Sequence, residues 1–180
     1  AYYDREQGQK PLLLKLSLLQ PHYPYHTDHE RFTYYLNRVD PYLNQNVFEH
    51  PFLRQRCVIP GQDVSERELR RAVAAYYGMV ETIDDHYQSV LSALEHVGQN
   101  LDEWIIIYTS DHGEMLGQHG IWEKQKFFEA SARVPLIIRF PQHFEPITVR
   151  ENVNLCDLFA TLCDLVDIPC PSGLDSRSLV

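Results

Sequence analysis

The stretch Glu103-Trp-Ile-Ile-Ile-Tyr-Thr-Ser-Asp-His-Gly113 holds the transition on which the interpretation of the fold depends. Residues 103–109 are rich in β-branched and aromatic side chains without polar alternation, which is typical of a strand covered on both faces. The run ends abruptly at Ser110, Asp111 and His112. The stretch therefore predicts a buried strand whose end carries a carboxylate and an imidazole.

Two more apolar runs of strand length accompany this stretch. Pro11 to Leu19 is nearly continuous and is interrupted only by Lys15, and Val134 to Phe140 is the later run. Both predict strands, and the first again lacks the alternation of a half-exposed strand. Between them, Pro21 to Val64 has no periodicity and is crowded with proline, tyrosine and histidine, so we expect a long connection that is functional or mobile.

Two helices are predicted. Ser65-Glu-Arg-Glu68 has the pattern of a capping box, and Gly98 supplies a stop. A heptad spacing also fits a coiled coil, but a strand follows Gly98 closely, so we expect the helix to pack against a sheet. Asn154 begins the last helix. The predicted apolar seam of the first helix consists of Leu69, Val73, Tyr76, Val80, Ile83, Tyr87, Val90, Leu94 and Val97.

The order of these elements predicts an α/β fold with a mixed or parallel sheet flanked by helices. The chain has 180 residues, of which 44% are apolar and 23% charged, so it is neither disordered nor fibrous. A net charge of −9 disfavours nucleic acid and anionic membranes as partners. The apolar runs are far shorter than the about 20 residues of a membrane-spanning helix.

The four cysteines lack paired C-x-x-C spacing, so neither a zinc knuckle nor a dense disulfide scaffold is expected. Cys57, Cys156, Cys163 and Cys170 are instead predicted to be buried thiols.

Reactive side chains follow two of the predicted strands. His22 lies between Pro21 and Pro24 after the first, and Asp111 and His112 follow the second. Since ligands of open α/β sheets gather at the carboxyl ends of strands, we expect these groups to share one crevice. Adjacent Asp and His can offer an oxygen and a nitrogen to one divalent metal, which makes them half of a metal site.

The longer context is specific. Thr109 to Lys124, followed by Arg133-Val-Pro-Leu-Ile137, closely resembles the signature of the sulfatase family within the alkaline phosphatase superfamily. Gln20 to Pro24, the long helix and the segment from Asp157 to Leu179 follow the order of that family. The resemblance covers nearly the whole chain but only the later part of a full-length catalytic domain.

The ends of the chain agree with such a part. It starts at Ala1 without an initiator Met and stops at an apolar Val180. Residues 1–180 are therefore expected to be a single α/β fragment of a sulfatase catalytic domain that lacks the N-terminal nucleophile region.

The resemblance assigns roles to four residues. Asp111 and His112 match the second pair of ligands for the catalytic divalent ion, which is calcium in most sulfatases and manganese in some relatives. Lys124 matches the lysine that contacts the sulfate and its bridging oxygen, where an ammonium stabilises charge on the leaving group. His22 matches the histidine that hydrogen-bonds the same oxygen and acts as general acid. Lys126 is the competing lysine, but the spacing favours Lys124.

Other polar residues are given structural roles. His119 is expected to orient the glycine-spaced loop, and Arg133 to brace acidic loops. Asp84 and Asp85 flank the apolar seam of the long helix, where a solvated surface is expected.

The chain also departs from the family. Sulfatases use a formylglycine made from Cys or Ser within Cys-x-Pro/Ala-x-Arg, and no such site is present. The family's first acidic ligand pair is also absent, although calcium takes six to eight oxygen ligands. The isolated polypeptide is therefore expected to turn over no ester and to bind metal weakly.

Three functions follow from these observations. The first is part of a sulfatase that hydrolyses a small-molecule or glycan sulfate ester, completed by the missing N-terminal part of the domain. The second is a phosphonate or phosphate ester hydrolase on the same scaffold. The third is a non-catalytic module whose heptad helix mediates assembly into an oligomer.

Overall fold

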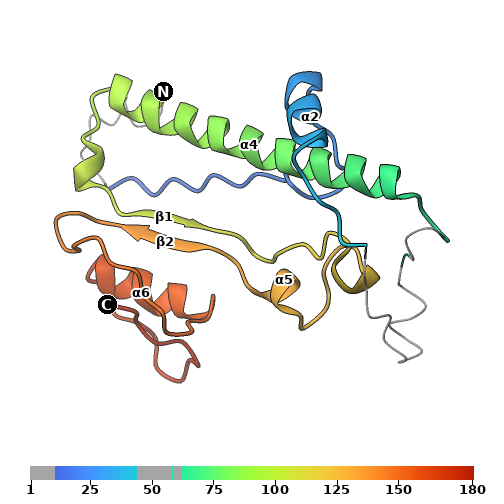
Figure 1. The fold of residues 1–180 in the computed structure, drawn as a ribbon. Helices are drawn as coiled ribbons and strands as arrows, with labels where there is room; N and C mark the ends of the chain where they lie inside the picture. Colours follow the sequence, from blue (N-terminus) through green and yellow to red (C-terminus); the bar gives the residue numbers. More distant parts are fainter. Residues whose placement is uncertain (1–10, 44–57, 59–61) are drawn as a thin grey trace. The chain divides into compact units, whose positions relative to one another are not determined.

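The computed structural model describes residues 11–43, 58 and 62–180 (Figure 1). The chain divides into two compact units. The first unit comprises residues 1–41 and 67–87, and the second comprises residues 42–66 and 88–180. Among the described residues, no helix has the length and apolar character needed to cross a membrane.

The predicted long helix is present as α4, Glu66–His96 (Figure 1). It begins directly after Ser65, and Gly98 ends it in the left-handed conformation, with φ of 87°. The amide of Gly98 donates to the carbonyl of Glu95 at 2.9 Å, and that of Gln99 donates to the carbonyl of Leu94 at 3.0 Å. Gly98 therefore provides the predicted stop by satisfying carbonyls that the helix leaves open.

The buried face of α4 differs from the predicted heptad seam. Val80 is 44% exposed and Val97 is 66% exposed. Gly78 is instead buried, and a Cβ built on it would lie 2.7 Å from the side chain of Thr27. The absence of a side chain at Gly78 therefore lets the segment before α2 approach α4 closely. The spacing of the apolar residues alone does not reveal this contact. The buried residues of α4 are Leu69, Val73, Ala74, Ala75, Gly78 and Met79.

The apolar run 11–19 does not form the predicted strand within the described part of the chain. It is extended but joins no ladder, and Leu13 and Leu19 are 87% and 81% exposed. A strand needs a neighbour to satisfy its backbone groups, and the ladder found among the described residues joins two other segments. Residues 11–19 therefore have the sequence pattern of a strand but pair with no other strand among the described residues.

One helix of the first unit was not predicted. The helix α2, His29–Leu36, lies within the aperiodic connection. Asp28 caps it by accepting a hydrogen bond from the amide of Arg31 at 3.0 Å. None of its residues is buried, so it lacks the apolar stripe from which a helix is usually predicted.

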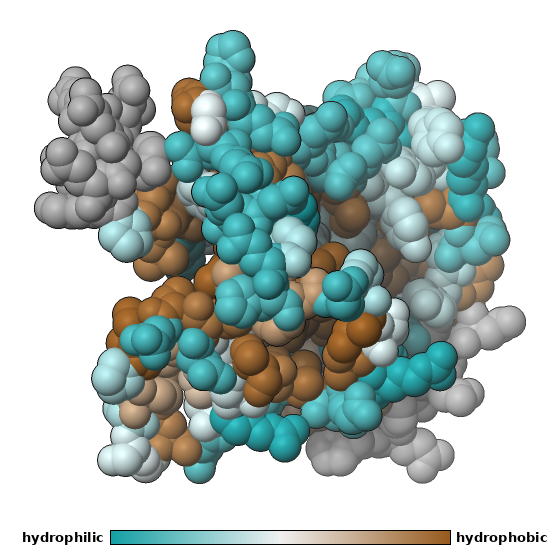
Figure 2. All heavy atoms as spheres, turned by 90° about the vertical axis from the view of Figure 1, so that its left-hand side faces the viewer, coloured by the Kyte–Doolittle hydropathy of each residue, from teal (hydrophilic) through white to brown (hydrophobic). Residues whose placement is uncertain are grey.

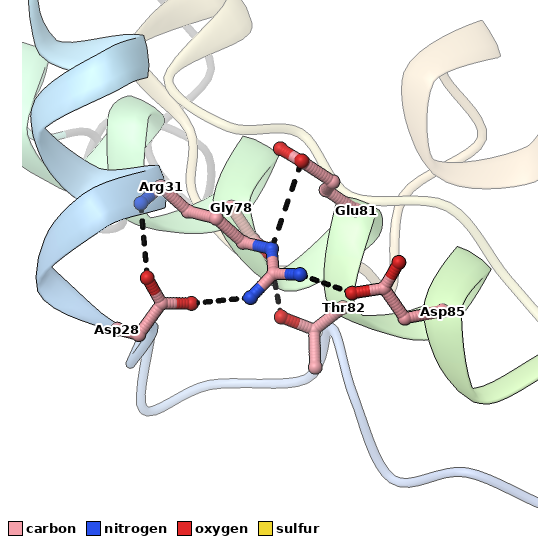
Figure 3. Close-up of polar contacts among 6 residues, drawn as sticks. All are labelled: Asp28, Arg31, Gly78, Glu81, Thr82 and Asp85. Carbon is pink, nitrogen blue, oxygen red and sulfur yellow. Dashed lines mark hydrogen bonds and ion pairs between the residues drawn. The ribbon is translucent and has the colours of Figure 1, made fainter.

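Charge fixes α2 to α4 in place of apolar burial (Figure 3). The guanidinium of Arg31 contacts the carboxylate of Asp28 at 2.6 Å, pairs closely with Asp85, and lies 3.7 Å from Glu81. Hydrogen bonds from the amide and then the guanidinium of Arg31 hold the pKa of Asp28 below its usual value. Asp84 and Asp85 are both exposed, as expected, and Asp85 in addition belongs to this ion cluster.

The second unit contains the sheet. The strands β1, Ile106–Thr109, and β2, Leu136–Arg139, pair in antiparallel fashion, with Thr109 opposite Leu136 and Ile106 opposite Arg139. Two predicted strands are thus confirmed, and their antiparallel pairing does not fit a wholly parallel sheet. The other elements are η1, Leu101–Glu103; η2, Gln118–Gly120; α5, Glu129–Ala132; and α6, Asp157–Leu165.

The last predicted helix is α6, which begins three residues after Asn154. The buried carboxylate of Asp157 accepts hydrogen bonds from the amides of Asn154 at 3.0 Å and Arg177 at 3.1 Å. The hydrogen bond from the amide of Arg177, followed by that from Asn154, holds the pKa of Asp157 below its usual value. Asp157 therefore fastens the last residues of the chain to the start of α6.

The cysteine prediction needs correction. Cys156 and Cys170 are exposed and Cys163 is half-buried, so none of these three is the buried thiol that was expected. Cys57 lies outside the described residues. Two of the thiols lie on or beside a short helix whose buried face is formed by Ala160 and Thr161, which leaves the cysteines on its other sides.

We predict that Arg31→Ala releases α2 from α4. Because α2 buries no side chain, amide hydrogen exchange over residues 29–36 should accelerate by roughly tenfold, while the core of α4 stays protected. Arg31→Lys should give an intermediate result, since one ammonium cannot reach all the carboxylates at once. Glu30→Ala is the matched control on the same helical turn. Unchanged exchange in Arg31→Ala would contradict the assignment of the cluster as the main attachment of α2.

We predict that Asp157→Asn lowers the melting temperature by a few degrees at pH 7. The lowered pKa of Asp157 contributes stability that is present above the unfolded value of 3.8 and is lost as the pH falls through the folded value. The difference between wild type and variant should therefore shrink below about pH 4. Asp167→Asn is the control, since Asn tolerates the left-handed backbone at that exposed position. A difference that is independent of pH would contradict the role of the charge.

Candidate functional site

The end of β1 is built to present a carboxylate. Thr109 donates its hydroxyl to the carbonyl of Pro135 at 2.9 Å, which fixes the last ladder position. Ser110 then donates to the carbonyl of His112 at 2.9 Å, and the amide of His112 donates to Oδ1 of Asp111 at 3.0 Å. The side chain of Asp111 is 85% exposed. The backbone turn therefore occupies one carboxylate oxygen and leaves the carboxylate open to a ligand.

The imidazole of His112 is held in one orientation by the next residue. Its Nδ1 lies 2.8 Å from the carbonyl of Gly113. Since a carbonyl oxygen only accepts, Nδ1 carries the proton and the neutral ring has its lone pair on Nε2. This Nε2 lies 3.7 Å from Oδ2 of Asp111. A hydrogen bond from the second ring nitrogen to a carbonyl is the arrangement that orients metal-ligating histidines.

Gly113 holds this pair against α5. Its amide donates to the carbonyl of Ser131 at 2.8 Å, and a Cβ added to it would lie 2.1 Å from the carbonyl oxygen of Ala130. No side chain fits in that space, because the neighbouring atom is backbone rather than the end of a flexible chain. The glycine after the Asp-His pair is therefore required by packing.

The loop from Gly113 to Lys124 folds back on itself. The amide of Met115 donates to the carbonyl of Glu123 at 2.8 Å, and that of Gly117 donates to the carbonyl of Ile121 at 3.0 Å. Met115 and Ile121 are buried, at 0% and 1% exposure. The loop is therefore an ordered part of the scaffold, and its backbone bonds fix the segment that leads into Lys124.

His119 supports this loop, as the sequence predicted. It adopts the left-handed conformation, with φ of 58°, inside η2. Its ring lies on Phe128, with centroids 4.7 Å apart. The imidazole thus packs the loop against the segment that leads into α5.

Four positive-φ residues that are not glycine lie in this region. Glu123 and Gln125, on either side of Lys124, have φ of 68° and 69°. Such conformations persist only where the surroundings impose them, and they cluster at functional sites. The half-buried Lys124 therefore projects from an imposed backbone geometry, while the ammonium of Lys126 lies 3.5 Å from the carbonyl of Lys124.

His22 belongs to the first unit, whereas the other three predicted residues belong to the second. Its Nδ1 donates to the carbonyl of Tyr23 at 2.9 Å, and its ring lies 4.3 Å from that of Tyr23. In the neutral ring, Nε2 again carries the lone pair. Asp111, His112 and Lys124 belong to one loop system, and the convergence of Lys124 and His22 on the Asp-His pair stays a prediction.

The donor set fits one side of a metal ion. A carboxylate oxygen and an imidazole nitrogen 3.7 Å apart have the chemistry and spacing of neighbouring ligands to one cation. No group of three or more His, Cys, Asp or Glu side chains suited to a metal occurs among the described residues. The described part of the chain therefore offers two adjacent donors, and their role as half of a metal site stays a prediction.

The role expected for Arg133 rests on one weak contact. Its guanidinium lies 3.8 Å from the carboxylate of Glu129, and both side chains are more than four-fifths exposed. An exposed pair of this kind contributes little to stability.

The sequence analysis also missed Glu114, whose carboxylate accepts two backbone hydrogen bonds in the loop. Its position directly after Asp-His-Gly was the available signal.

Known proteins are similar to this chain over most of its length. A family model described as Sulfatase matches residues 2–168. A choline-sulfatase of Rhizobium meliloti is 31% identical over 91% of this chain, and an arylsulfatase of Clostridium perfringens is 31% identical over 99%. The chain spans 33% and 38% of these two relatives, about a third of their length.

A solved structure shows the same fold. The phosphonate monoester hydrolase of Agrobacterium radiobacter matches 98% of this chain and 39% of its own, with 27% identity and a TM-score of 0.77. The expected α/β fold is therefore confirmed. From the family match over nearly all of its length, the chain belongs to the sulfatase family.

Proposed function

We propose that residues 1–180 form the later part of a catalytic domain that hydrolyses a small-molecule or glycan sulfate ester. The observation that carries this proposal is the Asp111 and His112 pair, whose imidazole is oriented by the carbonyl of Gly113 with Nε2 toward the carboxylate. In a chain of the sulfatase family, such a pair at a strand end is suited to an ion that activates an oxyanion ester.

Asp111 and His112 would hold a divalent cation, with calcium as the first candidate and manganese as the second. When bound, such a cation supplies positive charge that polarises the oxygens of the ester group. The further ligands that calcium requires would come from the part of the domain before residue 1.

Two side chains would act on the leaving group. Lys124 would place its ammonium beside the bridging oxygen and stabilise the negative charge that develops there as the bond breaks. His22, protonated on Nε2, would give a proton to the departing alcohol, since Nδ1 is already engaged with the carbonyl of Tyr23. The nucleophile, a formylglycine, would lie in the preceding part of the domain.

Exposed apolar residues support this division of the domain. Leu13, Leu14, Leu16, Leu18 and Leu19 are all 36% exposed or more, on a segment with the pattern of a strand covered on both faces. Other hydrophobic side chains are open at the surface on the face drawn in Figure 2. Large exposed apolar areas mark interaction sites, and we propose the missing N-terminal part of the same domain as the partner that covers them.

A phosphonate or phosphate ester hydrolase is the second candidate. The observation that favours it is the similarity to the phosphonate monoester hydrolase of Agrobacterium radiobacter over 98% of the chain. Sulfate, phosphonate and phosphate esters all present tetrahedral oxyanions of similar size, so the same lysine and ion site would serve them. The ester preference of the whole protein separates the two candidates.

We predict that the full-length protein cleaves an aryl sulfate and that purified 1–180 does not. The reason is that 1–180 contains half of the ligand pairs and no formylglycine motif. The measurement is chromophore release from an aryl sulfate, with an aryl phosphonate monoester assayed in parallel. The full-length Asp111→Asn variant should lose activity and divalent-metal affinity together, and Asp84→Asn is the matched control. Release by 1–180 would contradict the proposal, and faster release from the phosphonate would favour the second candidate.

We predict that Lys124→Ala in the full-length protein lowers kcat most for esters of poorly acidic alcohols. The loss should be about a hundredfold for an alkyl sulfate and much smaller for a nitrophenyl sulfate, because a stable leaving group needs little charge stabilisation. Lys126→Ala is the control and should retain most activity. The reverse order of the two variants would assign the leaving-group role to Lys126.

A further inference from the structure

The carboxylate of Glu114 spans the base of the loop that separates the Asp-His pair from the lysine. Its Oε1 accepts hydrogen bonds from the amide of Leu116 at 3.1 Å and from the amide of Glu123 at 2.6 Å. The second bond joins residues nine positions apart. One oxygen therefore ties the start of the loop to the residue directly before Lys124.

This bond acts where the backbone is least free. Glu123 has a φ of 68°, a conformation that residues other than glycine adopt only when their surroundings impose it. The hydrogen bond to Oε1 fixes the amide of Glu123, and so the plane of the peptide bond that enters this residue. Because the direction of the next side chain depends on these dihedral angles, the bond sets where Lys124 points.

The other end of the brace is fixed to the metal-ligand pair. Glu114 follows His112 by two residues, and between them Gly113 is held by the carbonyls of Ser131 and Ala130. Glu114 therefore starts from the anchored strand end and grips the segment that carries the lysine. Together with the backbone bond from the amide of Met115 to the carbonyl of Glu123, this side chain fixes the residue before Lys124 relative to the Asp-His pair.

Geometry argues against a direct chemical role for this carboxylate. The Oε1 atom is already occupied by two amides, and no metal-binding group of three or more side chains is found in the described part of the chain. The position requires a side-chain oxygen that is far enough from the backbone to accept from the amides of both Leu116 and Glu123. Gln supplies that acceptor without the charge, whereas Asp keeps the charge but is one methylene shorter.

We propose that Glu114 is a positioning residue that holds Lys124 in register with Asp111 and His112 through the amide of Glu123. The inference rests on the proposed function, because it assigns a purpose to the place of Lys124. Its physical core, the bond between Glu114 and Glu123, is independent of that function and is measured separately.

The test uses Glu114→Gln and Glu114→Asp in the full-length protein. Glu114→Gln should keep kcat within about threefold, while Glu114→Asp should lose about ten- to a hundredfold, since displacement of a catalytic group by about 1 Å costs up to 10². The loss should be greatest for alkyl sulfates, as for Lys124→Ala, and the Glu114→Asp and Lys124→Ala effects should not multiply in the double variant. Divalent-metal affinity should be unchanged in both single variants, and Glu129→Ala serves as the exposed control.

Two outcomes would overturn the proposal. One is retained activity in Glu114→Asp with loss in Glu114→Gln, which would show that the charge matters and the reach does not. The other is weakened metal affinity in parallel with activity, which would place the effect on the ion site instead of on Lys124.

Amide exchange gives a readout that does not need catalysis. The amide of Glu123 should exchange roughly tenfold faster in Glu114→Asp and at the wild-type rate in Glu114→Gln. If the wild type hydrolyses no ester but this pattern holds, the proposed function fails while the brace stands. If the wild type is active and the exchange rate of the Glu123 amide is the same in both variants as in the wild type, the positioning role of Glu114 is wrong while the proposed function stands.

Discussion

The contact of Gly113 with the backbone of α5 is the constraint on which the candidate site depends. The carbonyl of Ala130 occupies the space that any side chain at position 113 would need, and the amide of Gly113 is bonded to the carbonyl of Ser131. The same residue uses its own carbonyl to orient the imidazole of His112. Backbone atoms of Gly113 thus anchor the end of the strand to α5 and orient the imidazole of His112.

The elements that the sequence predicted well are those whose information is local. The helix α4 carries its own cap, apolar period and glycine stop, and it was found within a few residues of its ends. The strands β1 and β2 were found for the same reason. The segment 11–19 has equally clear strand composition, but a strand is completed by a neighbour, and its leucines remain exposed in the described part of the chain.

The residues that escaped prediction act through contacts between distant positions. Arg31 of α2 pairs with Asp28 and with Asp85 of α4. The helix α2 itself has no apolar stripe from which a sequence pattern could predict it. Glu114 reaches an amide nine residues away, a distance that only the folded loop makes short. Asp111, His112, Lys124 and His22 were recognisable as a motif, whereas the bonds that orient the first two depend on coordinates.

The attachment of α2 by charge has a consequence for how such a chain diversifies. A helix that contributes nothing to the core places few demands on the size or shape of its residues, provided that the arginine and its carboxylates are kept. Exposed side chains such as Tyr34, with Arg38 stacked above it, are therefore open to replacement during evolution, whereas Tyr35 contacts Tyr77 of α4. The scaffold of the first unit separates an ionic anchor from a surface on which new selectivity can be built.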